Sequence, residues 1–215
     1  MLLEQLRKEV LAASLDLLKY GLVTLTGGNV SGRDEETGYI AITPSGMSYE
    51  TLSPEDIVII DGSGKVIEGK WKPSVDTPDH LYIYGKRQDV FSIIHTHSTY
   101  ACSFAMLQQE IPCATTTLAN EVGGAVPVAR YAPVASGLIG PHVVEALGDK
   151  SGCLLANHGV ITVGTSVRHA LTAAVMLEDN AKSYLFAKHI GNPVLLEAAE
   201  IQKARDVFTY LYGQK

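Results

Sequence analysis

Long apolar stretches are missing from this sequence of 215 residues. It contains no run of 18 apolar residues, the length typical of a membrane-spanning helix. The first twenty residues, MLLEQLRKEVLAASLDLLKY, carry charges between their apolar positions and have no hydrophobic segment followed by a cleavage site. We therefore expect a cytoplasmic protein with no membrane partner.

Cysteine and positive charge are also scarce. The three cysteines are an odd number at unpatterned spacing, which favours reduced thiols in the core over disulfides or a zinc knuckle. Lysine and arginine number 17 against 23 acidic residues, and they are scattered, so no basic surface for nucleic acid is expected. A small anionic ligand would need positive potential from a metal or from backbone N–H groups.

The sequence does have enough apolar residues, 46%, for one sizeable core, and it has no internal repeat, so we expect a single domain over residues 1–215. Expected helices are 1–20, 78–87, 99–108, 138–147, 166–190 and 195–211. Expected strands are 30–32, 39–43, 57–61, 65–67, 90–97, 126–130 and the two segments that flank His158. Short, turn-forming links between the early strands indicate antiparallel pairing. The pattern predicts an α/β fold in which helices cover a mostly antiparallel sheet.

Histidines stand at the ends of two of these apolar strands. In IIHTHSTY, His95 and His97 are two residues apart, so on a strand both rings would point to the same face. His158, in LLANHGV, follows another strand and is the candidate third ligand of a catalytic metal site. An exposed or hydrogen-bonded pair is the alternative for H-x-H alone. Ordinary structural or surface roles are expected for the remaining histidines, which are His80, His142, His169 and His189.

Two loops are rich in hydrogen-bond donors. TLTGGNVSGR and ITPSGMSY combine glycines, which expose backbone N–H groups, with serine, threonine and asparagine. Together they could bind a phosphate, although plain turn chemistry explains either loop alone. KPSVDTPDH adds Ser74 to the phosphate candidates. It also contains Asp76, which could serve as a base near a metal or could cap the helix that follows.

These segments resemble the class II aldolase and adducin family. The motifs GGNVSGR, ITPSGMSYETLSPEDIVIID, KPSVDTPDH, HTHSTYA and LLANHGV occur in that family's order and spacing, over nearly the whole chain. The resemblance implies a three-layer α/β fold with a central, mostly antiparallel sheet. It also implies a homotetramer with fourfold symmetry whose active sites lie between neighbouring subunits.

The resemblance further implies roles for individual residues. One Zn²⁺ per subunit, or another divalent transition metal, would be bound by His95, His97 and His158. The substrate phosphate would be surrounded by Thr26, Asn29, Ser45, Gly46 and Ser74. Asp76 occupies the position of the catalytic carboxylate. The terminal YLYGQK points to Tyr212 as a proton donor that reaches the adjacent subunit's site.

The expected reaction is retro-aldol cleavage of a phosphorylated ketose similar to L-fuculose 1-phosphate. Zinc would act as a Lewis acid on the C2 carbonyl and C3 hydroxyl oxygens, so that cleaving the C3–C4 bond leaves a metal-bound enediolate. Tyr212 would exchange a proton with the aldehyde oxygen, and Asp76 with the enediolate carbon. The products would be a dihydroxyacetone phosphate fragment and an aldehyde.

An L-ribulose-5-phosphate 4-epimerase, which uses the same bond cleavage and then re-forms the bond, is the alternative. Asp76 favours it, because the family's epimerases have aspartate at this position and its fuculose-phosphate aldolases have glutamate. Asn120 opposes it, because it stands where the epimerases place an acid–base aspartate and an amide cannot carry that proton. Neighbouring Glu121 could substitute. We favour the aldolase over the epimerase, over a zinc hydrolase, and over a non-catalytic module that lacks the metal ligands.

Overall fold

The computed structural model describes the backbone of residues 1–211 and the side chains of residues 1–207. The strands are β1 (Gly28–Arg33), β2 (Ile40–Ile42), β3 (Val58–Ile60), β4 (Val66–Glu68), β5 (Ser92–Thr96), β6 (Val128–Ala129), β7 (Gly152–Leu155) and β8 (Gly159–Gly164). They form one sheet in the order β4-β3-β2-β1-β5-β8-β7-β6. Every pairing is antiparallel except that of β6 with β7. The predicted mostly antiparallel sheet is therefore confirmed.

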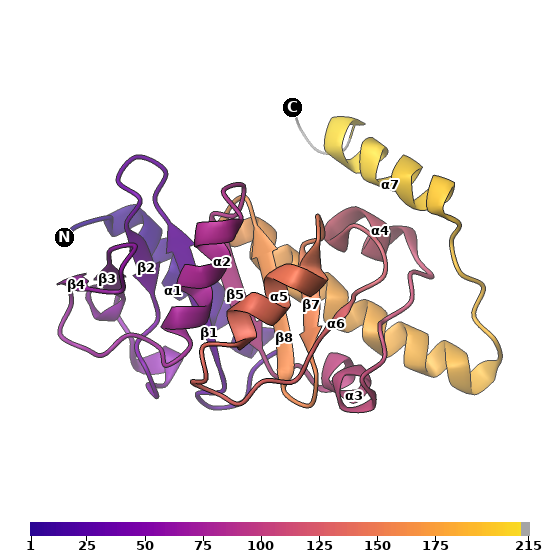
Figure 1. Cartoon of the computed structure of the whole chain (residues 1–215), viewed down its shortest axis with the longest axis horizontal. Coiled ribbons are helices and arrows are strands. Elements are labelled where there is room, and N and C mark those ends of the chain that lie inside the picture. Colours follow the sequence, from indigo (N-terminus) through magenta and orange to yellow (C-terminus); the bar gives the residue numbers. More distant parts are fainter. Residues whose placement is uncertain (212–215) are drawn as a thin grey trace.

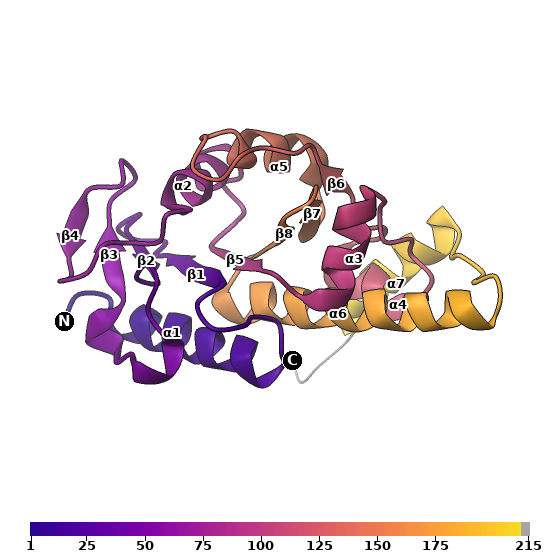
Figure 2. The ribbon, with the colours of Figure 1, turned by 90° about the horizontal axis from the view of Figure 1, so that it is seen from below.

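Helices cover both faces of this sheet. They are α1 (Glu4–Lys19), α2 (Thr77–Lys86), α3 (Thr99–Leu107), α4 (Thr116–Val122), α5 (Ile139–Leu147), α6 (Val167–Ile190) and α7 (Ala198–Leu211), with the short 3₁₀ helices η1 (Tyr49–Thr51) and η2 (Pro54–Asp56). Seen from below, α2 and α5 lie on one side of the sheet and α1 and α6 on the other (Figure 2). The predicted three-layer α/β architecture is confirmed.

Alternating strand residues build two cores, one on each face. Ile93 packs in the cluster beneath α2 and α5, whereas the next residue, Ile94, packs in the cluster beneath α1 and α6. This alternation follows from the two-residue repeat of a strand, and burial on both faces explains why the central strands are apolar throughout. None of the described helices combines the length and apolarity needed to cross a membrane.

A third cluster includes residues of β7 and β8 and lies where α3 and α4 pack on α6, while α7 packs on α4 (Figure 1). The sequence does not predict helix α4, because its seven residues begin with β-branched threonines and are too few to show a helical repeat. Its start is fixed locally, since the Thr115 hydroxyl accepts a hydrogen bond from Leu118 N at 3.2 Å. It ends at Gly123, whose φ of 97° favours glycine.

The central strands bring three chain segments to one edge of the sheet. β5 lies between β1 and β8 and is antiparallel to both, and Thr96 at its end pairs with Gly28 and with Val160. The segment before β1, the segment after β5 and the turn before β8 therefore meet at this edge. The predicted strand 90–97 is one residue too long at this end, so His97 follows the strand rather than lying in it.

Candidate active site

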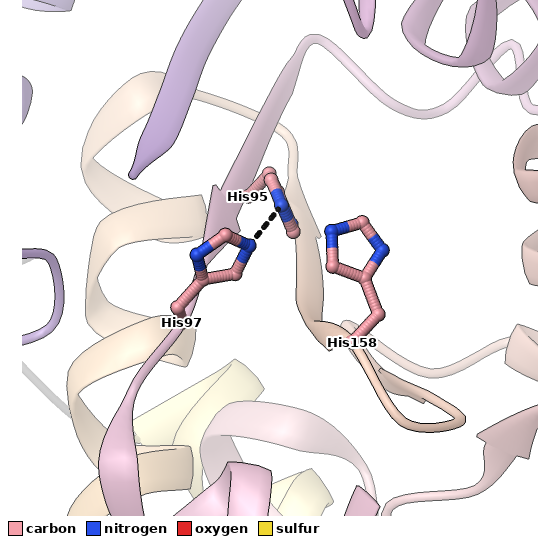
Figure 3. A group of neighbouring side chains, drawn as sticks. All are labelled: His95, His97 and His158. Atoms are coloured by element: carbon pink, nitrogen blue, oxygen red, sulfur yellow. Dashed lines mark hydrogen bonds between the residues drawn. The ribbon is translucent and has the colours of Figure 1, made fainter. Parts of the chain in front are cut away.

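The three candidate metal ligands lie together at this edge of the sheet. Figure 3 shows the rings of His95, His97 and His158 turned toward one another. Their ring centroids are 4.7 to 5.2 Å apart, and each ring offers one nitrogen within 4.8 Å of the other two. His95 is buried, His158 is half-buried and His97 is exposed, so one side of the group is open. The structure thus brings together the three histidines that the sequence singles out.

The backbone beside His158 and His97 is fixed by hydrogen bonds to other segments of the chain. His158 lies in the tight turn between β7 and β8, beside Asn157, which has a left-handed φ of 56° and donates its N–H to Ala105 O. His97 precedes α3, whose first turn is fixed by the Glu178 carboxylate, an acceptor for the backbone N–H groups of Tyr100 and Ala101 at 2.8 Å each. Sequence reasoning missed Glu178, because it lies 78 residues from Tyr100 and no motif links the two.

The hydrogen bonding of His95 suits metal binding. Its Nδ1 lies 2.9 Å from Val160 O, and a carbonyl only accepts, so Nδ1 carries the proton and Nε2 presents its lone pair to the group. Such a carbonyl partner commonly orients metal-binding histidines. His95 Nε2 lies 3.0 Å from His97 Nε2, close to the roughly 3.3 Å between nitrogens around a tetrahedral zinc. The donor set fits a divalent transition metal with an open position.

Partial or full desolvation favours the neutral form of these rings. Desolvation lowers the pKa of His95 to about 3, and it also lowers the pKa values of His97 and His158. The neighbouring rings lower the pKa of His95 further, because a second positive charge at this spacing is unfavourable. Neutral imidazole is the form that ligates a metal, so no protonated ligand opposes binding at neutral pH.

Asp76 lies beside the histidines and does not cap a helix with its side chain. It occupies the N-cap position of α2, yet its carboxylate makes no capping hydrogen bond. Instead, Asp76 Oδ2 accepts a hydrogen bond from Asn29 Nδ2 at 2.7 Å. Asn29 pairs with His95 across β1 and β5, so its side chain and the His95 ring share one face of the sheet. The half-buried carboxylate is thereby fixed near the histidines.

The phosphate candidates lie on two loops that are joined to each other. Ser45 N donates to Lys72 O, and Ser74 N donates to Thr43 O, each at 3.0 Å. Thr43 Oγ1 in turn accepts from Val30 N of β1 at 3.2 Å. Ser45 and Gly46 are exposed, whereas Ser74 is buried. The loops that contain Ser45, Gly46 and Ser74 are thus placed beside the strand that carries Asn29.

The glycine loop before β1 lies against the histidines. A Cβ on Gly27 would be 3.2 Å from His97 Nδ1, so this loop and the ring are in close contact. Thr26, the remaining phosphate candidate, is exposed directly beside Gly27. The described phosphate candidates therefore border the same edge of the sheet as the histidines.

Two other residues named from the sequence, Asn120 and Glu121, lie away from the histidines. Tyr212 falls outside the described residues. Asn120, on α4, can donate its amide to Ala204 O at 2.7 Å and to Thr116 O at 3.1 Å. Asn120 and Glu121 line a hollow of about 750 Å³ that is different from the one lined by Asp76, His95 and His158. Burial raises the pKa of Glu121.

The four remaining histidines are not part of the group. His80 is buried and hydrogen-bonded to Ser31, and His142 and His169 have partners within hydrogen-bond distance on the protein. His189 is exposed near the end of α6. The three cysteines are free thiols, two buried and one half-buried, as predicted.

Comparisons with known proteins match this architecture. The family model for the class II aldolase and adducin N-terminal domain matches residues 8–185. The 5-deoxy-D-ribulose 1-phosphate aldolase of Bacillus thuringiensis serovar kurstaki is 38% identical over 215 residues, the full length of both chains. A solved L-fuculose 1-phosphate aldolase superimposes with a TM-score of 0.92 at 33% identity and covers 96% of this chain and 97% of its own.

A second solved structure extends the match at lower identity. The L-fuculose-1-phosphate aldolase of Thermus thermophilus is 26% identical, with a TM-score of 0.76 over 88% of this chain and 98% of its own. The family model alone covers more than half of the chain, and the Bacillus relative matches along its entire length. The chain belongs to the class II aldolase and adducin family.

Proposed function

We propose that this protein is a metal-dependent aldolase that cleaves a ketose phosphorylated at C1 between C3 and C4. The products would be dihydroxyacetone phosphate and an aldehyde. The observation that carries the proposal is the placement of three neutral histidines beside Asp76 and two donor-rich loops at one edge of the sheet. The named relatives, which are aldolases of 5-deoxy-D-ribulose 1-phosphate and L-fuculose 1-phosphate, support a substrate of this class.

The histidines supply the ligands for a divalent metal, for which we favour zinc. His95, His97 and His158 would hold it and leave one side open to substrate. A metal bound there would act as a Lewis acid on the substrate's carbonyl and neighbouring hydroxyl oxygens. The chain then needs no lysine to form a Schiff base.

Asp76 is the proposed proton-transfer group for the three-carbon fragment. Its carboxylate is held by Asn29 and is free of a capping role, so it can exchange a proton with the carbon that is released when C3–C4 breaks. Asn29 keeps it in place and has a buried Oδ1 with no partner among the described residues.

The phosphate is proposed to bind at the donor-rich loops. Thr26, Ser45 and Ser74 supply hydroxyl donors, Gly46 supplies a backbone N–H, and the second amide hydrogen of Asn29 adds one more donor. Because the loops lie beside the histidines, a phosphate bound there would direct the ketose carbonyl toward the metal position.

Tyr212 is proposed to exchange a proton with the aldehyde oxygen in the site of a neighbouring subunit of a homotetramer. It would take this proton from the C4 hydroxyl as the C3–C4 bond breaks. Exposed apolar side chains flank the site: Leu25 is 81% exposed and Val75 is 60% exposed. Leu25 precedes Thr26 and Val75 precedes Asp76, so a subunit interface that covers them would run along the site.

A substrate panel tests the proposed reaction. Metal-loaded protein is incubated with L-fuculose 1-phosphate, 5-deoxy-D-ribulose 1-phosphate and L-ribulose 5-phosphate, and dihydroxyacetone phosphate, aldehyde and isomer formation are each followed. We expect cleavage of at least one 1-phosphate. If no 1-phosphate is cleaved while L-ribulose 5-phosphate is interconverted with D-xylulose 5-phosphate, the aldolase proposal is wrong.

The epimerase remains the second candidate because Asp76 is the residue that the epimerases carry. An amide at position 120 cannot transfer the proton that epimerisation needs on the second face of the aldehyde. Asn120 lines a different hollow from the histidines of its own chain, so a carboxylate there would act in a neighbouring subunit's site. Asn120→Asp should therefore raise epimerisation relative to cleavage, by up to about 10²-fold. Asn120→Ser, which introduces no carboxylate, is the matched control. An unchanged ratio in Asn120→Asp would show that position 120 does not decide between the reactions.

A further inference from the structure

A small hollow lies beside the histidines, on the face of the sheet that α2 covers. The residues that line it are Asp76, Asp79, His80, His95 and His158, together with the apolar Ile139, Leu155 and Ile161. It has room for about one water molecule. Asp76 and His80 are four residues apart at the start of α2, where His80 N donates to Asp76 O, so their side chains lie on the same face of the helix.

His80, one of the residues that line this hollow, has one ring nitrogen without a partner among the described residues. Its side chain is only 1% exposed, and its Nε2 makes no hydrogen bond with any described residue. A buried imidazole nitrogen without a partner is rare in native proteins, because burial removes its hydrogen bonds to water. The mechanism proposed above makes no use of His80.

The other nitrogen of His80 belongs to a buried hydrogen-bonded chain. Ser31 Oγ lies 2.7 Å from His80 Nδ1 and 2.7 Å from Tyr84 OH. If Tyr84 donates to Ser31 and Ser31 donates to His80, both hydroxyl hydrogens are used. The reverse direction would leave the buried Tyr84 hydrogen without an acceptor among the described residues. The first direction places the His80 proton on Nε2.

We propose that His80 is a positioning residue for Asp76, to which its Nε2–H donates through one bridging water molecule. The Tyr84–Ser31–His80 chain selects the tautomer that makes this donor. The Asp76 carboxylate is then held from two sides, by Asn29 and by this water. Burial lowers the pKa of His80 to about 4, so the ring is neutral and carries a single proton at pH 7. The inference rests on the proposed role of Asp76.

The tautomer is tested without any measurement of activity. Nitrogen-15 labelling of the histidines in the full-length, metal-loaded protein reports which ring nitrogen is protonated, and His80→Asn identifies the His80 signals. We expect protonated Nε2 and unprotonated Nδ1 for His80. Protonated Nδ1 would overturn the proposal. Ser31→Ala should remove the preference, because Nδ1 then loses its donor.

Two variants separate positioning from folding. Asn keeps a polar atom near the Nδ1 position and loses the one at Nε2, whereas Gln keeps a polar atom near Nε2. His80→Asn should lower kcat about 10- to 100-fold with KM and metal content near wild type, and His80→Gln should recover most of that loss. His189→Asn, at an exposed position, is the control.

Equal kcat in His80→Asn and wild type, or equal losses in the Asn and Gln variants, would contradict the proposal. Thermal unfolding of both variants shows whether a loss comes from instability. If wild type cleaves no phosphorylated ketose, the proposed function fails, and the nitrogen-15 measurement still decides the direction of the hydrogen-bonded chain.

Discussion

The spacing of the three histidines depends on a glycine that packs against two of their rings. A Cβ on Gly159 would lie 2.5 Å from Thr96 O, 2.8 Å from His97 Cδ2 and 3.0 Å from His95 Cε1. The nearest of these neighbours, Thr96 O, is a backbone atom, which cannot rotate away as a flexible side chain could. Any larger residue at this position must push β8 away from β5 or displace a ring.

Gly159→Ala should therefore weaken both stability and metal binding. We expect a loss of about 1–3 kcal/mol in the free energy of unfolding, the usual cost of overpacking, together with weaker zinc binding. Denaturant unfolding and zinc titration measure the two effects. Gly62→Ala is the matched control, because a Cβ there would meet nothing within 4 Å. A Gly159→Ala protein as stable as this control would refute the packing account.

At the residue scale, the sequence predicts the candidate metal ligands better than it predicts the groups that hold them in place. His95 and His97 share a two-residue spacing and His158 ends an apolar strand, and both patterns are visible in the sequence alone. The supports of these rings are contacts across the fold: Val160 O for His95, and Glu178 for the turn after His97. No local pattern marks such partners, since only the completed fold brings them together.

At the scale of elements, the segment between β4 and α2 places Ser74 and Asp76, and Asp56 anchors its start. Asp56 Oδ1 accepts from Trp71 Nε1 at 2.8 Å and from Lys70 Nζ at 2.9 Å, while Oδ2 accepts from Ser53 N and Ser53 Oγ. The Lys70 ammonium, followed by the Ser53 and Trp71 donors, holds the pKa of Asp56 well below its usual range.

Asp56→Asn should lower stability in a pH-dependent way. The pKa of Asp56 is lower in the folded protein than in the unfolded chain, where it is about 3.9. The ionised carboxylate therefore stabilises the fold fully above about pH 4, and this stabilisation is lost as pH falls toward the folded-state pKa. We expect a cost of about 1.5–3 kcal/mol at pH 7 that shrinks below about pH 4. Urea unfolding at several pH values measures it, with the exposed Glu36→Gln as control. A pH-independent difference would contradict the assignment.

Element boundaries are predictable where the repeat is long and uninterrupted. The sequence predicts a helix over 166–190, and α6 spans Val167–Ile190. By contrast, α4 has seven residues, a length at which a helical repeat cannot be recognised, and the predicted strand 126–130 is reduced to the two residues of β6. Their structure is imposed by packing: α4 lies against α6 and α7, and β6 adds to the edge of β7.

At the scale of the whole molecule, the proposed use of Tyr212 by a neighbouring subunit can be tested by mixing two inactive variants. His95→Ala should lose the metal, and Tyr212→Phe should lose the proton donor but keep the metal. If sites are shared, a site is active when a Tyr212→Phe chain supplies the metal ligands and the neighbouring His95→Ala chain supplies Tyr212. Random assortment around a closed ring gives this arrangement at about one site in four, so co-assembled 1:1 mixtures should regain roughly a quarter of wild-type turnover. Sedimentation should show tetramers. A mixture that never exceeds the sum of the separate variants would place each Tyr212 in its own chain's site.

The central claim is that a metal held by His95, His97 and His158 makes this chain an aldolase, and a metal titration tests it most directly. Chelator-treated protein receives increasing zinc, and both bound zinc and aldehyde release from a 1-phosphate ketose that the untreated protein cleaves are measured at each step. We expect turnover to rise in proportion to bound zinc and to level off at one ion per chain, with no such rise in His158→Ala. Full turnover in metal-free protein, or equal zinc binding and turnover in the His158→Ala variant, would contradict the account.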